Sequence, residues 1–247
     1  MEQARADNAE VINEPGPGSG RTAALLTWLR RQWPVPFRPW AHGRDVAILY
    51  STMVVVISLM IAIQPPHRLA ALVEQSSTNL ANMAAHPFAV LFLSAFVVSP
   101  ATGLILIVPV LICYGEVQRW LGRVSTILVI VFGHVGATLV VMMLEITALH
   151  RHIVGFSVVV KPDVGVSYGM FAAIGALLFR VPPSWRTVYG LATLAVIAVL
   201  VIWFRDFTNL GHAAAYLIGI SLSWLLHTAA LRRPAMVQTG RKSAIVT

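Results

Sequence analysis

Hydrophobic residues occur along this chain in long runs that short polar segments separate. Six of these runs are about as long as an α-helix that crosses a hydrocarbon core of roughly 30 Å. They lie at residues 46–63, 101–117, 124–144, 165–181, 186–204 and 208–230. The pattern predicts an all-α, polytopic membrane protein built as a bundle of six transmembrane helices.

A shorter apolar stretch at residues 88–98 precedes the second of these runs. It is too short to cross the membrane alone, and the turn-forming pair Ser99-Pro100 follows it. We therefore expect a re-entrant or interfacial segment here. If the stretch instead joins the next run as one long kinked helix, the number of spans stays six.

Composition and charge agree with a membrane protein and predict its orientation. Hydrophobic residues make up 57% of the chain, charged residues 11%, and the formal net charge is +8. Fourteen of the eighteen Lys and Arg residues lie in the termini or in and beside the second and fourth connections between spans. Because cytoplasmic segments carry the excess of basic residues, both termini should be cytoplasmic and face anionic lipid. No nucleic-acid partner is needed to explain the charge.

The chain divides into three segments. Residues 1–45 form a cytoplasmic flexible tail with a Pro- and Gly-rich linker at 14–20. Within this tail, residues 21–33 fit either an amphipathic helix lying on the inner leaflet or a disordered segment. Residues 46–231 form the membrane domain, and residues 232–247 a short basic cytoplasmic tail. No cleavable signal peptide is visible, so the first helix should direct insertion into the cell membrane.

Two short motifs place candidate chemistry at the outer ends of hydrophobic runs. Ser167 lies in Gly165-Val166-Ser167-Tyr168-Gly169, and His212 follows Asn209-Leu210-Gly211. Both residues should lie one to two helical turns below the outer surface, where ionisable side chains usually face the bundle interior. Ser167 and His212 are therefore a candidate nucleophile and base.

Small residues continue from both motifs at spacings of three and four. One stripe contains Gly165, Gly169, Ala172 and Ala176, and the other contains His212, Ala215, Gly219 and Ser223. Such stripes let two helices approach closely, as a serine–imidazole hydrogen bond requires. Ordinary membrane packing, with the imidazole bonded to a backbone carbonyl, explains the same spacing.

These motifs resemble those of the rhomboid intramembrane serine proteases, and the resemblance covers about residues 46–231. Gly165 to Leu177 looks like the family's Gly-x-Ser-Gly helix, and Asn209 to His212, followed by Gly219, like its histidine helix. Two further segments are similar to family features, namely the cytoplasmic turn Tyr114 to Gly122 and the Pro-aromatic pair in His86-Pro87-Phe88.

The resemblance implies a six-helix rhomboid-like fold and a Ser-His dyad without an acidic third member. Ser167 would attack the scissile carbonyl of a transmembrane substrate, and His212 would act as general base and then general acid. Backbone N–H groups at the start of the serine helix, including that of Ser167, would hold the oxyanion. The residues point to no cofactor.

Two departures from the family pattern leave two functions open. Gly103 and Ile107 stand near the places where rhomboid proteases carry oxyanion-binding His and Asn side chains. Tyr168 stands where the family has glycine, and its phenol either crowds the site or replaces a lost hydrogen-bond donor. The chain is therefore expected to be a divergent protease or a pseudoprotease that binds membrane-protein clients. Few intramembrane charges and no clear inverted repeat argue against a small transporter.

Other polar residues are expected to have structural roles. His134 should lie toward the cytoplasmic side, remote from the candidate site, as a packing or interfacial residue. His150 and His152 have no evident third metal ligand, so a solvated loop without metal is expected. Asp163 and Asn209 precede Ser167 and His212 by four and three residues, and are expected to cap the two helices.

Overall fold

The computed structural model of the chain describes residues 19–32, 42–98 and 103–243, and all regular secondary structure in these residues is helical. Residues Ser99-Pro100, most of the linker at 14–20 and the residues before it lie outside the described part. The α-helices are α1 Ser19–Gln32, α3 Asp45–Ala62, α4 Pro66–Gln75, α5 Leu80–Ala85, α6 Pro87–Ser94, α7 Gly103–Leu121, α8 Arg123–His150, α9 Val166–Ala176, α10 Pro183–Phe204 and α11 Phe207–Ser243. Two 3₁₀ turns, η1 Phe156–Val160 and η2 Leu177–Phe179, lie on either side of α9.

Each predicted apolar run overlaps one of the longer helices or α9 with its 3₁₀ extension. Among the described residues, four segments are long and apolar enough to cross a membrane: α3, α8, α10 and Phe207–Leu226 of α11. A shorter apolar segment, Val166–Phe179, comprises α9 and η2. The chain is therefore an all-helical membrane protein, and the count of six spans stays a prediction.

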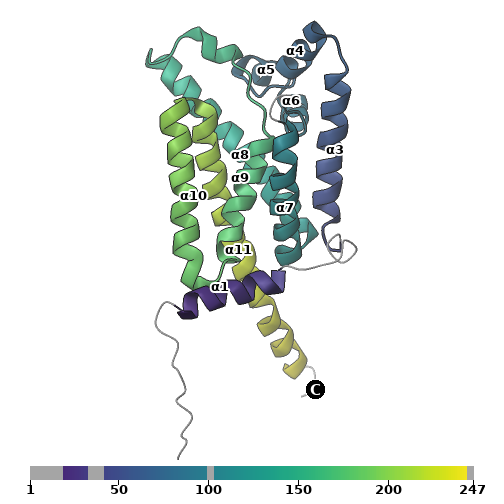
Figure 1. Cartoon of the computed structure of the whole chain (residues 1–247), viewed down its shortest axis with the longest axis vertical. Coiled ribbons are helices and arrows are strands. Elements are labelled where there is room, and N and C mark those ends of the chain that lie inside the picture. The colour runs from purple at the N-terminus through teal and green to yellow at the C-terminus, as the bar shows by residue number, and fades with distance from the viewer. Residues whose placement is uncertain (1–18, 33–41, 99–102, 244–247) are drawn as a thin grey trace, which may run out of the picture.

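The longer helices form a bundle with a different cover at each end (Figure 1). Helices α4 and α5 cover one end, called here the α4 end, and α1 lies across the other, called the α1 end. The C-terminal part of α11 also extends beyond the α1 end, so the first and last described helices lie on the same side of the bundle. The tail segment that the sequence left open is thus helical over Ser19–Gln32.

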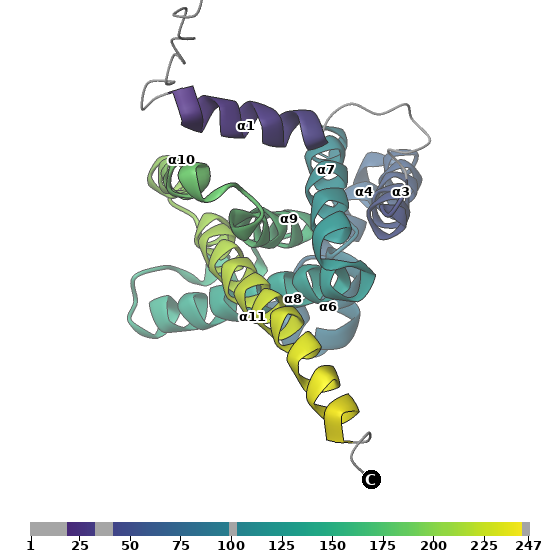
Figure 2. The ribbon, with the colours of Figure 1, turned by 90° about the horizontal axis from the view of Figure 1, so that it is seen from below.

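Helix α9 occupies the middle of the bundle, between α7, α8 and α11 (Figure 2). Nine of its eleven residues are buried, and the exceptions are Ser167 and Ile174. A helix that is mostly apolar on every side belongs in the interior of a bundle. The composition of α9 therefore explains its central position.

Small residues let α11 and α8 lie close to α9. A Cβ atom added at Gly219 of α11 would overlap the carbonyl oxygen of Ala172, and one added at Gly133 of α8 would overlap the Ala172 side chain. Lower along the same contact, the Ser223 hydroxyl donates a 2.9 Å hydrogen bond to the carbonyl of Ala176. These contacts hold the backbones of α9 and α11 at close range.

Two apolar segments differ from their predicted lengths. Helix α8 has 28 residues, so it extends further at both ends than the run at 124–144, and it is tilted in the bundle (Figure 1). The apolar stretch before α7 forms a separate short helix, α6, which ends at Ser94. Because residues 95–98 after it are not helical, α6 and α7 do not form one long kinked helix.

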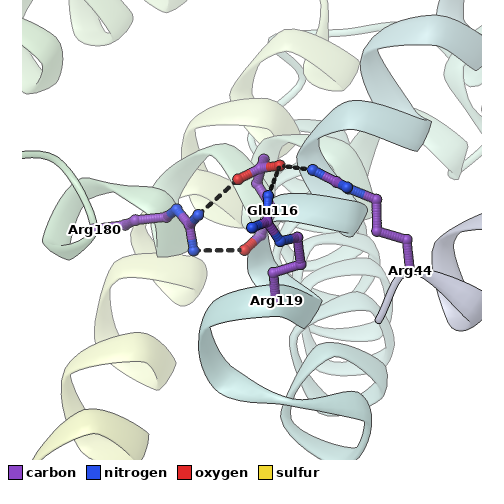
Figure 3. Close-up of polar contacts among 4 residues, drawn as sticks. All are labelled: Arg44, Glu116, Arg119 and Arg180. Carbon is purple, nitrogen blue, oxygen red and sulfur yellow. Dashed lines mark hydrogen bonds and ion pairs between the residues drawn. The ribbon is translucent and has the colours of Figure 1, made fainter. Parts of the chain in front are cut away.

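A charged cluster holds three parts of the chain together near the α1 end (Figure 3). The Glu116 carboxylate on α7 binds Arg44, which precedes α3, and lies 2.7 Å from Nη2 of Arg180, which follows η2. A third guanidinium, that of Arg119, lies 3.7 Å from Glu116. Arg180 also donates a 3.2 Å hydrogen bond to the Glu116 carbonyl. The cluster fixes the end of the α9–η2 segment opposite Ser167.

Candidate active site

Ser167 and His212 meet between the N-terminal ends of α9 and α11. Ser167 is the second residue of α9, and His212 is the sixth residue of α11. The hydroxyl oxygen of Ser167 lies 2.9 Å from Nε2 of His212, and both side chains are half-buried. This distance is within the range over which an imidazole accepts a serine proton.

Aromatic rings hold the His212 imidazole from two sides. The ring of Phe171, one turn after Ser167, stacks on the imidazole with centroids 4.3 Å apart and planes 22° apart. The ring of Tyr168 meets it edge-on, at 5.6 Å and 69°. The imidazole therefore has little freedom to rotate away from Ser167.

Asn209 contacts His212 rather than capping α11. Its Oδ1 atom lies 3.1 Å from Nδ1 of His212. The cap is supplied by Asp206, whose Oδ1 accepts hydrogen bonds from the backbone N–H of Asn209 at 2.9 Å and from its Nδ2 at 2.7 Å. The predicted capping role of Asn209 was wrong because α11 begins at Phe207, which makes Asp206 the residue before the helix.

Tyr168 is accommodated without crowding Ser167. Its ring is fully buried, and its hydroxyl donates a 2.6 Å hydrogen bond to Oδ2 of Asp163. On the facing helix, a Cβ atom at Gly211 would lie 2.5 Å from the Tyr168 ring, so this glycine makes room for the phenol. The hydroxyl is thus engaged with Asp163, and it does not supply the donor that the second helix lacks.

Asp163 joins the loop before α9 to two other parts of the site. Its carboxylate also accepts a 3.1 Å hydrogen bond from Thr208 of α11, and its backbone carbonyl accepts one of 2.8 Å from the N–H of Thr78. Burial raises the pKa of the Asp163 carboxyl above its ordinary value, and the Tyr168 hydrogen bond opposes this shift. The expected capping of α9 was wrong, because the residue before α9 is Gly165 and no side chain caps that end.

His134 lies directly against the start of the serine helix. A Cβ atom at Gly165 would overlap its imidazole, whose Nε2 atom lies 2.9 Å from the Leu91 carbonyl and 3.2 Å from the Ser94 hydroxyl. The Ser94 carbonyl in turn accepts a 3.0 Å hydrogen bond from the N–H of Gly165. The expected remote position was wrong, because His134 is the twelfth residue of a long tilted helix and α9 begins at the same depth.

The α7 residues beside the start of α9 are apolar. A gap between α3, α7 and Val166 at the start of α9 is lined from α7 by Gly103, Leu106, Ile107 and Val110 and from α3 by Ser51 and Val54, and it has no room for a water molecule. None of these α7 residues has a side chain that can donate a hydrogen bond. The N–H groups of Val166 and Ser167 are in the first turn of α9, where a helix leaves its amides without partners inside the helix.

The predicted packing residues are buried, but they face different helices. Gly165 and Gly169 allow close approach of His134 on α8 and of the Tyr114 hydroxyl on α7, whereas Gly219 faces Ala172. Ala215 is fully buried. The small-residue stripe of the serine helix is thus divided among three neighbouring helices.

His150 is the last residue of α8, and His152 lies in the loop that follows. His150 and His152 are exposed. In the part of the chain that the structure describes, no three His, Cys, Asp or Glu side chains lie close enough together to hold a metal ion.

The chain was compared with known protein families, curated proteins and solved structures. The sequence model of the family described as rhomboid-like protein matches residues 44–231. Comparisons with curated proteins and with solved structures give no match. The matched region makes up more than half of the chain and contains both Ser167 and His212. The chain therefore belongs to the rhomboid-like protein family.

Proposed function

We propose that the chain is a divergent rhomboid-type intramembrane serine protease in which Ser167 is the nucleophile and His212 the general base. The observation that carries the proposal is the 2.9 Å distance between the Ser167 hydroxyl and Nε2 of His212. A membrane-embedded imidazole needs a polar partner, and here that partner is a hydroxyl at the start of a helix. The pair has the geometry of an activated nucleophile.

The proposed reaction begins when His212 accepts the Ser167 proton as the hydroxyl oxygen attacks a peptide carbonyl of a transmembrane substrate. The tetrahedral intermediate places negative charge on the former carbonyl oxygen. His212 then gives the proton to the leaving amine, and the same residue activates the water that releases the acyl group. Stacking on Phe171 keeps the imidazole in place through these steps.

Stabilisation of the oxyanion falls to the backbone. The first-turn N–H groups of Val166 and Ser167 are the available donors, and the positive end of the α9 dipole adds to their field. Loss of one side-chain donor typically lowers kcat by about 10²–10³-fold, so we expect a slow protease.

The proposed orientation has the α1 end in the cytoplasm. The charged cluster around Glu116, with three arginines to one carboxylate, lies near this end. The side carrying most of the basic residues should face the cytoplasm and anionic lipid in the cell membrane. Substrate would reach Ser167 from the lipid, and water from the α4 end.

A second function, that of a client-binding pseudoprotease, is favoured by the apolar α7 side of the site. Gly103 and Ile107 leave no side-chain donor where the family's proteases have two. Such a protein would keep the fold and bind membrane-protein clients without cleaving them.

Labelling with a fluorophosphonate probe distinguishes the two functions, since it needs no known substrate. The purified protein in detergent is compared with Ser167→Ala and His212→Ala, and with an active rhomboid protease as positive control. Labelling that disappears in both variants supports the protease. A folded preparation that stays unlabelled while the positive control reacts overturns it and favours the pseudoprotease.

A further inference from the structure

We infer that Asn209 and Asp206 fix the tautomer of His212, as positioning residues for the proposed dyad. The three side chains follow one another at intervals of three residues at the start of α11, where each lies within hydrogen-bond distance of the next. The role of Asn209 and Asp206 in catalysis rests on the proposed function. The tautomer itself is a property of the resting protein.

The Asp206 carboxylate determines which way the Asn209 amide points. The oxygen and nitrogen of an amide side chain are interchangeable by a half-turn, so their hydrogen-bond partners must distinguish them. Oδ1 of Asp206 lies 2.7 Å from the Asn209 side chain and already accepts the Asn209 backbone N–H. Because an ionised carboxylate only accepts, the NH₂ group of Asn209 must face Asp206.

The amide oxygen of Asn209 then faces the imidazole. It lies 3.1 Å from Nδ1 of His212, and a carbonyl oxygen accepts hydrogen bonds but cannot donate them. The proton of the neutral imidazole must therefore be on Nδ1. Nε2 is left with a free lone pair, 2.9 Å from the Ser167 hydroxyl. This is the tautomer that a general base needs.

The other neighbours of His212 do not set its tautomer. Phe171 and Tyr168 contact the imidazole through their rings, and the Tyr168 hydroxyl is bonded to Asp163. Asn209 is only 6% exposed, so water has little access to compete for its amide. When His212 takes up the Ser167 proton, the same chain places the Asp206 charge behind the imidazolium. The chain thus does for this dyad what an acidic third residue does in a triad.

Two variants test this inference, with a third as control. Asn209→Ala removes the acceptor, and Asp206→Asn removes the orienting charge while keeping a side chain that caps helices well. Leu210→Ala, in the same turn, is the matched control because Leu210 has no part in the chain of hydrogen bonds. Each full-length protein is labelled with ¹⁵N-histidine, and NMR in detergent micelles reports which imidazole nitrogen of His212 is protonated.

We expect Nδ1 to carry the proton in the wild type and in Leu210→Ala, and a mixture of tautomers in both test variants. Fluorophosphonate labelling of Ser167 should slow about tenfold in Asn209→Ala, which is more than any loss of folded protein explains. A proton on Nε2 in the wild type, or unchanged tautomers in both variants, overturns the inference. If wild-type Ser167 does not label but Nδ1 carries the proton, the proposed protease fails and the inferred hydrogen-bond chain stands.

Discussion

The hydroxyl of Tyr168 donates a 2.6 Å hydrogen bond to the carboxylate of Asp163, five residues earlier in the chain. Both groups are buried, and the acceptor is an acid. Removing the hydroxyl in Tyr168→Phe leaves a carboxylate oxygen short of a donor, which should lower the free energy of unfolding by about 1.5–3 kcal/mol. Chemical denaturation in detergent micelles measures this change.

Tyr216→Phe is the control for that substitution. Tyr216 is also buried, but its hydroxyl faces the neutral Thr193 side chain and, among the described residues, no carboxylate. Removing a hydroxyl that binds no charged group should change stability by about 1 kcal/mol or less. Equal losses in the two variants would show that the Tyr168–Asp163 bond adds nothing to stability.

The stability of the protein should depend on pH through Asp163. Burial raises the pKa of this carboxyl in the folded protein above its ordinary value of 3.8, and the nearby Asp206 raises it further. The folded state therefore keeps the proton to a higher pH than the unfolded state does. The resulting stabilisation is complete below pH 3.8 and is lost as the pH rises through the folded pKa.

Comparing the wild type with Asp163→Asn isolates this contribution, because the variant has no proton to release at residue 163. The difference in free energy of unfolding between them should change with pH just above 3.8 and level off once Asp163 is ionised in both states. Circular dichroism during denaturation at a series of pH values measures it. A difference that stays constant over this range would contradict the raised pKa.

The helices and the Ser167–His212 pair were accessible from sequence because each rests on a local pattern. Apolar runs mark the helices, and short motifs with small residues mark the helix ends where the pair lies. The surroundings of the pair depend instead on contacts between distant segments. His134 meets Ser94 across forty residues, and Asp163 meets Thr208 across forty-five.

No periodicity in the sequence encodes contacts between segments that are forty residues apart. The two wrong assignments of capping residues also depend on information that hydropathy does not give. Helix boundaries read from hydropathy are uncertain by a residue or two, and a cap depends on the exact boundary. Asp206 caps α11 because the helix begins one residue later, at Phe207. Asp163 is too far from Val166 to cap α9, and it binds Tyr168 instead.

Glu116→Gln should destabilise the fold substantially. The side chains of Arg44 and Arg180, which bind Glu116, are only 3% and 10% exposed, so the substitution removes a carboxylate charge that two buried guanidinium groups share. We expect a loss of about 2–3 kcal/mol, below the value for a fully buried pair because Glu116 is partly exposed. Glu74→Gln, on an exposed side chain of α4, is the matched control and should change little. If both variants lower the free energy of unfolding equally in chemical denaturation, the charged cluster around Glu116 does not stabilise the fold.

Gly219→Ala should separate the two helices that carry the dyad. The added methyl group would overlap the carbonyl oxygen of Ala172, a backbone atom that cannot move aside without shifting α9. Overpacking of this kind costs about 1–3 kcal/mol, which outweighs the gain of roughly 1 kcal/mol in helix propensity. Since the α9–α11 contact sets the Ser167–His212 distance, fluorophosphonate labelling should fall by more than the loss of folded protein explains.

Gly190→Ala on α10 makes the same chemical change at a helical site with space for it. The added methyl group would make an ordinary 3.4 Å contact with the Leu178 side chain. This variant should keep or slightly raise the thermal unfolding midpoint, because alanine favours the helix, and it should leave labelling unchanged. If Gly219→Ala behaves like Gly190→Ala in both measurements, close contact between α9 and α11 is not what holds Ser167 against His212.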